Sequence, residues 1–430
     1  MKKKSQLNQK IEAVTLRTLV VGIDIAKEKQ WARFVDCRGV ECGKAMYFRN
    51  DRTGFEAILA RMRQISKENS FAEVIVGMEP TGHYWKALAN YLMKQEGIHV
   101  VLVNPYHTKK AKELDDNSQT KSDKKDALTI ARLVKDGRYS EVYLPHDVYA
   151  DLRVLTTARN SVNRQKNALE NTILAVMDEY FPEFTKVFKH PFKGKAAMQV
   201  LKSCPFLKYI LQLGIAGVLT EIKKAVKKSV GMKRAQLLVD TAQASVGVDY
   251  GIDSARCKLR LLLESLELAN RQLAQIEAEM AAALQKIGMA EYLLSLKGVG
   301  IVSLAVCLGE LGNPLRFDDP RQLGRLAGYN LVEDSSGKNK SGTCISKRGT
   351  KGLRRVLYQM ALTCVAINPE LKELYHYLKT RKANPLKKMQ ALVVISKKLL
   401  TLIYTLAKKK QYYNPAKVFG EVRKKQLMAA

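Results

Sequence analysis

The chain has 430 residues, enough for two or three domains, and 46% of them are hydrophobic, so it can bury sizeable cores. Its 73 lysines and arginines outnumber 41 aspartates and glutamates, and the net charge of +32 indicates a polyanionic partner such as nucleic acid. No apolar run reaches about 18 residues and none follows the first five residues, so we expect no membrane span and no signal peptide. Seven scattered cysteines without zinc-ligand spacing favour reduced thiols in a cytoplasm.

Residues 1–150 predict an α/β domain. Strands are expected at residues 19–26, 31–35, 45–48, 74–79 and 99–103, with helices after the third strand and after each later strand. A hairpin meander followed by βαβ crossovers predicts a mixed sheet that helices cover on both faces.

Four acidic residues can meet at one edge of this sheet. Asp24 and Glu79 stand at the carboxyl ends of strands, where open α/β sheets place their sites. Asp123 and Asp126 share one face of a helix that Ser122 can cap. Carboxylate oxygens suit Mg²⁺, and two such ions can hold the attacking and leaving oxygens of a phosphodiester displacement. Each acid also has an ordinary alternative role, as a helix cap, a solvated helix start or an ion-pair partner.

Residues 151–288 predict long helices around a basic insertion. Apolar residues recur every seven positions from Leu155 to Val176, and a second seam with alternating spacings of three and four runs from Leu259 to Ala283. These seams fit a coiled-coil hairpin, a dimer contact or an ordinary helical bundle. The insertion between them carries paired lysines, including Lys223-Lys224, and reads as a helical segment with a surface for a polyanion.

Residues 289–380 predict a third, helical unit. Lys297, Gly298 and Gly300 lie between two helical patterns, which fits either a helix-hairpin-helix turn that faces a phosphate or a plain turn. A polar loop over residues 334–342 contains Ser336, which could act as a nucleophile beside cations that neutralise a pentacovalent phosphate. The nearby cations are Lys338, Lys347, Arg348, Arg354 and Arg355.

Residues 381–430 predict a basic, amphipathic helical tail. Its apolar stripe runs from Leu392 to Leu406 among many lysines, which favours packing along nucleic acid or the protein body over a membrane.

The order of several short motifs resembles the ribonuclease H-like fold in its Holliday-junction-resolvase (RuvC-like) form. More closely, it resembles the DEDD-type transposases of bacterial insertion sequences, the bridge-RNA-guided recombinases. The N-terminal motifs are Gly22-Ile23-Asp24-Ile25-Ala26-Lys27, Met78-Glu79-Pro80-Thr81-Gly82-His83-Tyr84-Trp85, Asn104-Pro105 and Lys121-Ser122-Asp123-Lys124-Lys125-Asp126-Ala127. Those similar to the family's C-terminal transposase domain are Leu326-Ala327-Gly328, Ser336-Gly337 and Ile345-Ser346-Lys347-Arg348-Gly349.

The resemblance implies an RNA-guided DNA recombinase that cuts and rejoins strands through a phosphoserine. It implies that Asp24, Glu79, Asp123 and Asp126 are catalytic and bind two Mg²⁺ ions, and that the nucleophile is Ser336, although Ser335 directly precedes it. The implied partners are donor DNA, target DNA and a structured non-coding bridge RNA. Activation of the serine by carboxylates of its own or a partner subunit would require a homo-oligomer, a dimer or a tetramer. The expected location is the bacterial cytoplasm, near the nucleoid.

Three other functions remain open from the sequence. The first is a RuvC-like junction nuclease that uses metal-activated water. The second is an actin-like kinase or ATPase, whose fold also opens with a Gly-x-Asp strand but which needs a second Asp-Gly phosphate loop that is not evident here. The third is a non-catalytic architectural protein.

Overall fold

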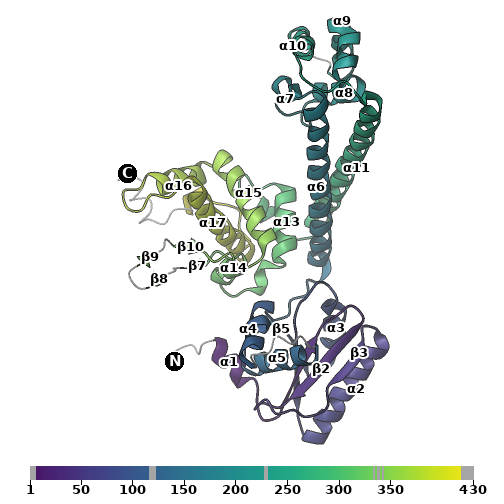
Figure 1. Cartoon of the computed structure of the whole chain (residues 1–430). Helices are drawn as coiled ribbons and strands as arrows, with labels where there is room; N and C mark the ends of the chain where they lie inside the picture. The colour runs from purple at the N-terminus through teal and green to yellow at the C-terminus, as the bar shows by residue number, and fades with distance from the viewer. Residues whose placement is uncertain are drawn as a thin grey trace. The chain divides into compact units, whose positions relative to one another are not determined.

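A computed structural model of the chain describes residues 6–115, 123–226, 231–332, 335–336, 339–340 and 343–417. The chain forms two compact units, Met1–Leu144 and Pro145–Ala430 (Figure 1). Each unit buries its own hydrophobic side chains.

A six-stranded mixed sheet organises the first unit, in the order β3-β2-β1-β4-β5-β6. The strands are β1 (Thr18–Asp24), β2 (Lys29–Val35), β3 (Met46–Arg49), β4 (Glu73–Met78), β5 (Ile98–Val103) and β6 (Tyr139–Glu141). β1, β4 and β5 run parallel to one another, whereas β2, β3 and β6 are antiparallel to their neighbours. The prediction that residues 19–26, 74–79 and 99–103 form adjacent strands is therefore confirmed. β6, which the sequence pattern did not indicate, extends the sheet beyond β5.

Helices cover both faces of this sheet, because alternate residues of each strand point to opposite sides. The helices are α1 (Gln6–Glu12), α2 (Arg52–Asn69), α3 (Trp85–Leu92), α4 (Pro105–Asp115) and α5 (Asp123–Lys135). One core places Val21 and Ile23 of β1 among buried residues of α2 and α3. The other places Val20 of β1 with Ile130 and Val134 of α5.

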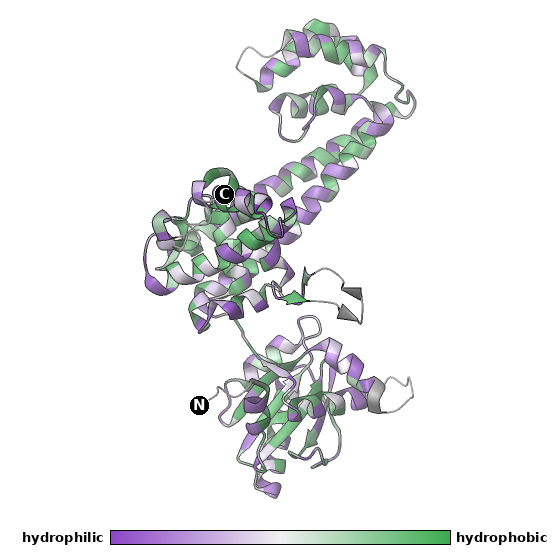
Figure 2. Cartoon of the chain, turned by 90° about the vertical axis from the view of Figure 1, so that its left-hand side faces the viewer, coloured by the Kyte–Doolittle hydropathy of each residue, from purple (hydrophilic) through white to green (hydrophobic). Residues whose placement is uncertain are grey.

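Two helices of 34 residues each, α6 (Asp147–Tyr180) and α11 (Ile252–Gln285), pack along each other in the second unit (Figure 1). Much of the predicted seam of α11 is buried, from Leu259 to Ala283. Arg159 and Glu277 join the two helices by an ion pair of 2.7 Å. Hydrophobic and hydrophilic residues alternate along both helices (Figure 2), as expected for a pair with one face against its neighbour and one in solvent.

The basic insertion folds into a helical cluster with its own core. Its helices are α7 (Phe184–Val187), α8 (Lys195–Ser203), α9 (Leu207–Ala225) and α10 (Met232–Gln243). Phe181, Phe184 and Phe206 lie in its core, whereas Lys223 and Lys224 are exposed.

The remaining α-helices of the second unit share one larger core. They are α12 (Ala290–Leu294), α13 (Ile301–Leu311), α14 (Pro320–Leu326), α15 (Lys351–Ile367), α16 (Pro369–Thr380) and α17 (Lys388–Lys409). The short 3₁₀ helices η1 (Pro314–Arg316) and η2 (Pro415–Lys417) contribute no residue to this core. Four two-residue strands lie between α14 and α15: β7 (Leu331–Val332), β8 (Ser335–Ser336), β9 (Asn339–Lys340) and β10 (Cys344–Ile345).

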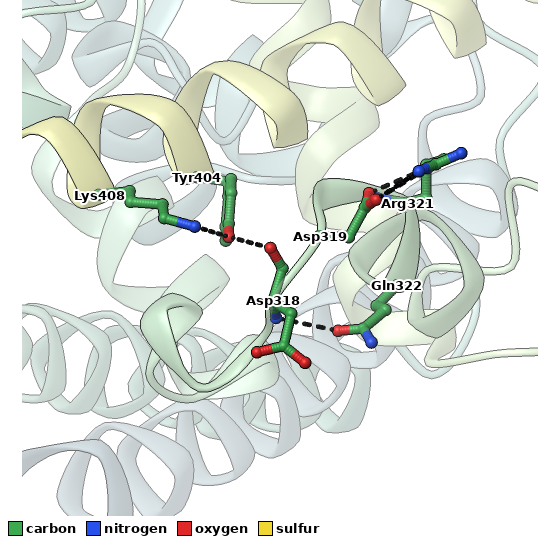
Figure 3. Close-up of polar contacts among 6 residues, drawn as sticks. All are labelled: Asp318, Asp319, Arg321, Gln322, Tyr404 and Lys408. Atoms are coloured by element: carbon green, nitrogen blue, oxygen red, sulfur yellow. Dashed lines mark hydrogen bonds and ion pairs between the residues drawn. The ribbon is translucent and has the colours of Figure 1, made fainter. Parts of the chain in front are cut away.

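The apolar stripe expected for the tail is part of this core. Leu392, Ile395, Leu399 and Ile403 of α17 are buried among residues of α13 and α15. Figure 3 shows Tyr404 of α17 donating a hydrogen bond to the Asp318 carbonyl (2.8 Å) and accepting one from Lys408 (3.1 Å). α17 is long and apolar enough to cross a membrane, but half of its most apolar window is buried inside the unit, as in a core helix.

Candidate functional site

Two glycines bring α5 directly onto the sheet. Gly22 of β1 is the register partner of Gly77 of β4. A Cβ atom at Gly22 would lie 2.1 Å from the carbonyl oxygen of Ala127, and one at Gly77 would lie 2.3 Å from Cγ2 of Val134. Both distances are far shorter than a van der Waals contact, so α5 reaches this depth only because neither strand carries a side chain there.

This packing brings the predicted carboxylates to one end of the sheet. Asp24 is the last residue of β1, Glu79 follows β4, and Asp123 and Asp126 lie in the first turn of α5. Burial, followed by the negative charges of Asp126, Asp123 and Glu79, raises the pKa of Asp24 from its ordinary value of 3.8 to about 7. Three of the four acids that the sequence groups together thus act electrostatically on the fourth, Asp24.

A lysine that the sequence analysis did not single out lies among these acids. Lys112 of α4 forms an ion pair of 2.5 Å with Asp126, whose side chain is only 14% exposed. The Lys112 charge also opposes the rise in the pKa of Asp24. The Thr81 hydroxyl donates a hydrogen bond of 3.1 Å to the Glu79 carboxylate. No sequence signal marks Lys112, because α4 carries several lysines and only the fold selects one.

The donor chemistry fits a hard divalent cation. The four acids supply only oxygen atoms as possible ligands. Together they make this end of the sheet negatively charged, and Lys112 neutralises part of that charge. Within residues 6–115 and 123–417, where described, no three acidic, histidine or cysteine side chains are already grouped closely enough to hold a metal. Metal binding would therefore require these side chains to move closer together.

In the second unit, the turn of Lys297, Gly298 and Gly300 connects α12 to α13. Gly298 has φ of +98°, and a Cβ there would lie 2.7 Å from Cα of Cys364 in α15. Its glycine is thus explained by backbone conformation and close packing. Gly300 is exposed, precedes α13 and has open space around it, and Lys297 is exposed beside it.

The base of the serine loop is held by backbone contacts. β7 pairs with β10, and β8 pairs with β9, so that Ser336 lies opposite Asn339. The side chain of Ser336, and the whole of Lys338, lie outside the described residues. Gly328 has φ of +72°, and its carbonyl accepts a hydrogen bond of 3.1 Å from the Lys347 backbone.

The four described cations near this loop differ in what they contact. Arg354 donates a hydrogen bond of 2.9 Å to the Ala327 carbonyl, so its guanidinium supports the loop base. Arg355 donates one of 2.5 Å to Asn160 of α6. Lys347 and Arg348 are exposed. The sequence predicts nucleic-acid contacts for all four, and in the structure Arg354 and Arg355 have partners within the protein.

Comparisons with known proteins connect both units to one family. Residues 21–182 match a family described as a transposase of the DEDD type of IS110, and residues 290–376 match the transposase IS116/IS110/IS902 family. The chain is 20% identical, over 69% of its length and 72% of the relative's, to a 43.6 kDa protein of insertion element IS110 from Streptomyces coelicolor. It is 23% identical, over 75% of its length and 78% of the relative's, to a protein of the same organism whose name assigns it to transposition of the mini-circle IS117.

Proposed function

Because the chain belongs to the IS110 family of DEDD transposases, we propose that it is an RNA-guided recombinase that cuts and rejoins DNA strands through a phosphoserine at Ser336, with Mg²⁺ held by the Asp24 cluster. As a transposase of an insertion element, it is an enzyme that cuts and rejoins DNA. Its first unit has the ribonuclease H-like fold of DEDD transposases, a class that uses divalent metal. The observation that supports the proposal most is that Glu79, Asp123 and Asp126 lie close enough to Asp24 to raise its pKa.

In this proposal Asp24, Glu79, Asp123 and Asp126 bind Mg²⁺, with room for two ions. The bound metal would stabilise the attacking and leaving oxygens of a phosphodiester displacement. Asp24, which has the raised pKa, must lose its proton before it can act as a ligand. In the metal-free protein Lys112 holds the Asp126 carboxylate through their ion pair.

The decisive experiment removes one carboxylate charge. Asp24→Asn should abolish DNA cleavage while the protein stays folded, since the change removes a ligand and also relieves repulsion. The matched control is Asp178→Asn, which changes an exposed acid of α6. Full strand cleavage by Asp24→Asn would rule out the carboxylate site.

Ser336 is proposed as the nucleophile of strand exchange. Its hydroxyl oxygen would form a bond to phosphorus while the bond from phosphorus to a deoxyribose oxygen breaks, and the serine proton would pass to solvent and the leaving oxygen would regain one. Such an ester conserves the bond for a later reversal onto a new strand. The exposed Lys347 and Arg348 are proposed to contact the DNA phosphates.

Capture of the covalent adduct tests the serine. Ser336→Ala should bind DNA normally and form no protein–DNA adduct, whereas Ser335→Ala should still form it. The opposite pattern would make Ser335 the nucleophile. If both variants cleave DNA normally, the better proposal is a RuvC-like junction nuclease that uses water.

The guide RNA is proposed from the family resemblance and the net charge of +32. Protein purified from cells that carry the complete element should retain one structured RNA, identified by sequencing. Equal affinity for unrelated RNAs of the same length would instead indicate simple polycation behaviour.

We further propose that α6 and α11 form a coiled-coil arm and that the turn at Gly298 and Gly300 is a helix-hairpin-helix. We also propose that the active form is a cytoplasmic homo-oligomer on DNA.

A further inference from the structure

A row of three side chains crosses the sheet from the acidic cluster to its outer edge. Asp24 of β1 is the register partner of Trp31 of β2, and Trp31 is the partner of Tyr47 of β3. Directly opposite residues of antiparallel strands point to the same face of a sheet. Trp31 and Tyr47 therefore lie on the same face as the Asp24 carboxylate, with Trp31 next to it.

The outer end of this row is open. α5 packs on β1 and β2, but Tyr47 on β3 is 60% exposed. The ring centroids of Trp31 and Tyr47 are 5.6 Å apart, and the two ring planes are inclined to each other by 56°. We name these two rings the aromatic platform. Tyr47 thus presents an exposed aromatic surface beside the Trp31 ring.

Cations surround the platform. Nζ of Lys124, from the first turn of α5, lies 4.7 Å from the Trp31 ring centroid. Lys29 and Arg49 are register partners two residues along β2 and β3 from the platform, so they share its face, and both are exposed. The platform thus combines π surfaces with positive charge, which is the combination that binds single-stranded nucleic acid.

A purely structural role explains only part of this arrangement. The contact of Lys124 with Trp31 can anchor the start of α5 to β2 and so hold Asp123 and Asp126 in place. It does not explain Tyr47, which lies on the far side of Trp31 and is mostly exposed.

We propose that the aromatic platform stacks an unpaired nucleobase of the DNA strand that is cut, beside the scissile phosphate. Lys29, Arg49 and Lys124 would contact the flanking phosphates. This inference rests on the proposed role of the Asp24 cluster in cutting DNA. A base inside a duplex is already stacked on its neighbours, so the platform selects DNA that is unpaired or opened at the cut site.

Fluorescence of Trp31 tests the stacking directly. The chain has two tryptophans, so Trp85→Phe leaves Trp31 as the only one. The full-length variant is titrated in EDTA with a short single-stranded DNA, at a salt concentration high enough to weaken purely ionic contacts. Stacking should quench Trp31 to saturation. The same DNA with an abasic site at each position, which keeps the phosphates but has no bases, should leave the fluorescence nearly unchanged.

A series at Tyr47 gives an independent measurement by fluorescence anisotropy of labelled DNA, without any change at Trp85. Tyr47→Ala should weaken binding about tenfold or more, as loss of one stacked base does, while Tyr47→Phe keeps the ring and stays within about twofold of the unchanged protein. Tyr250→Ala, which removes a 68% exposed tyrosine of the second unit, is the matched control and should have little effect.

Three results would overturn the proposal: equal quenching by abasic DNA, unchanged affinity in Tyr47→Ala, or tighter binding of RNA than of DNA of the same sequence. The first two would assign the surface to ionic contacts alone, and the third to an RNA strand. None of these measurements involves cleavage. If they fail while Asp24→Asn still abolishes cleavage, only the platform is rejected and the proposed function stands.

Discussion

At the scale of single residues, the surroundings of Asp24 disfavour the charged form of its carboxyl group. Its carboxyl group is largely buried at the end of β1 and close to three other acids, so the charged form is disfavoured in the folded protein. An unfolded chain would solvate the same group and let it ionise at its ordinary pKa. Functional sites commonly keep such costly groups, because a bound cation or substrate relieves the repulsion.

This perturbed pKa predicts how stability depends on pH. Between pH 3.8 and about 7 the folded protein retains a proton on Asp24 that the unfolded chain has lost. The stabilising effect of that proton is full below pH 3.8 and is lost as the pH rises to about 7. In EDTA, the unfolding free energy of Asp24→Asn should therefore rise relative to that of the unchanged protein as the pH increases from 5 to 8. We expect this difference to grow by about 1–2 kcal/mol after allowance for solvent screening.

Urea unfolding at the two pH values measures this difference. Asp178→Asn, at an exposed position of α6, should show no such gain. A gain that is equal at pH 5 and pH 8 would contradict the raised pKa.

At the scale of elements, the placement of α5 depends on Gly22 and Gly77, which leave the sheet without side chains where the helix packs. Gly22→Ala would insert a Cβ 2.1 Å from the Ala127 carbonyl oxygen, and helix backbone cannot move aside cheaply. We expect a loss of about 2–3 kcal/mol in the free energy of unfolding, as for overpacked cores, and lower DNA cleavage because Asp123 and Asp126 shift with the helix.

The matched control is Gly288→Ala, since a Cβ at this exposed glycine has nothing within 4 Å. Its stability should change by no more than about 0.5 kcal/mol. Thermal or urea unfolding of both variants provides the comparison, and a similar small effect in both would show that α5 tolerates displacement.

A second element-scale prediction concerns α17. The Tyr404 hydroxyl lies 2.8 Å from the Asp318 carbonyl (Figure 3). It also lies 3.0 Å from the Phe317 carbonyl, and these contacts tie α17 to the segment before α14. Tyr404→Phe should cost about 1–2 kcal/mol, because it leaves carbonyl oxygens without their donor. Tyr250→Phe, at a largely exposed tyrosine, should cost nothing measurable. Equal stability of the two variants in urea unfolding would contradict a structural role for this contact.

At the scale of the whole molecule, the net charge of +32 governs association with nucleic acid. Each phosphate contacted by lysine or arginine releases counterions, so affinity falls steeply with salt. With at least six such contacts, we expect the affinity for duplex DNA to fall by about a thousandfold between 50 and 200 mM salt. Filter binding or anisotropy over that range measures the slope, and a fall of less than about tenfold would show that the charge is not used in binding.

The sequence by itself determined the features that depend on near neighbours along the chain. Short apolar and aromatic segments indicated five of the six strands of the first unit's sheet, and their order indicated a mixed sheet. Asp24 and Glu79 were identifiable as candidates because each stands at the carboxyl end of a buried strand, and Asp123 and Asp126 because their spacing puts them on one helix face. The heptad seams indicated the long helices α6 and α11 in the same way.

Only the tertiary structure decided which distant residues meet. The depth of α5 depends on Gly22 lying beside Gly77, and this pairing is set by the register of β1 on β4. Register also aligns Asp24 with Trp31 and Tyr47, and helix packing chooses Lys112 as the partner of Asp126. In α17 a basic amphipathic pattern suits a nucleic-acid surface and a core helix alike, and the choice depends on the neighbours that cover it. Such contacts arise from long-range packing, which local sequence patterns do not encode.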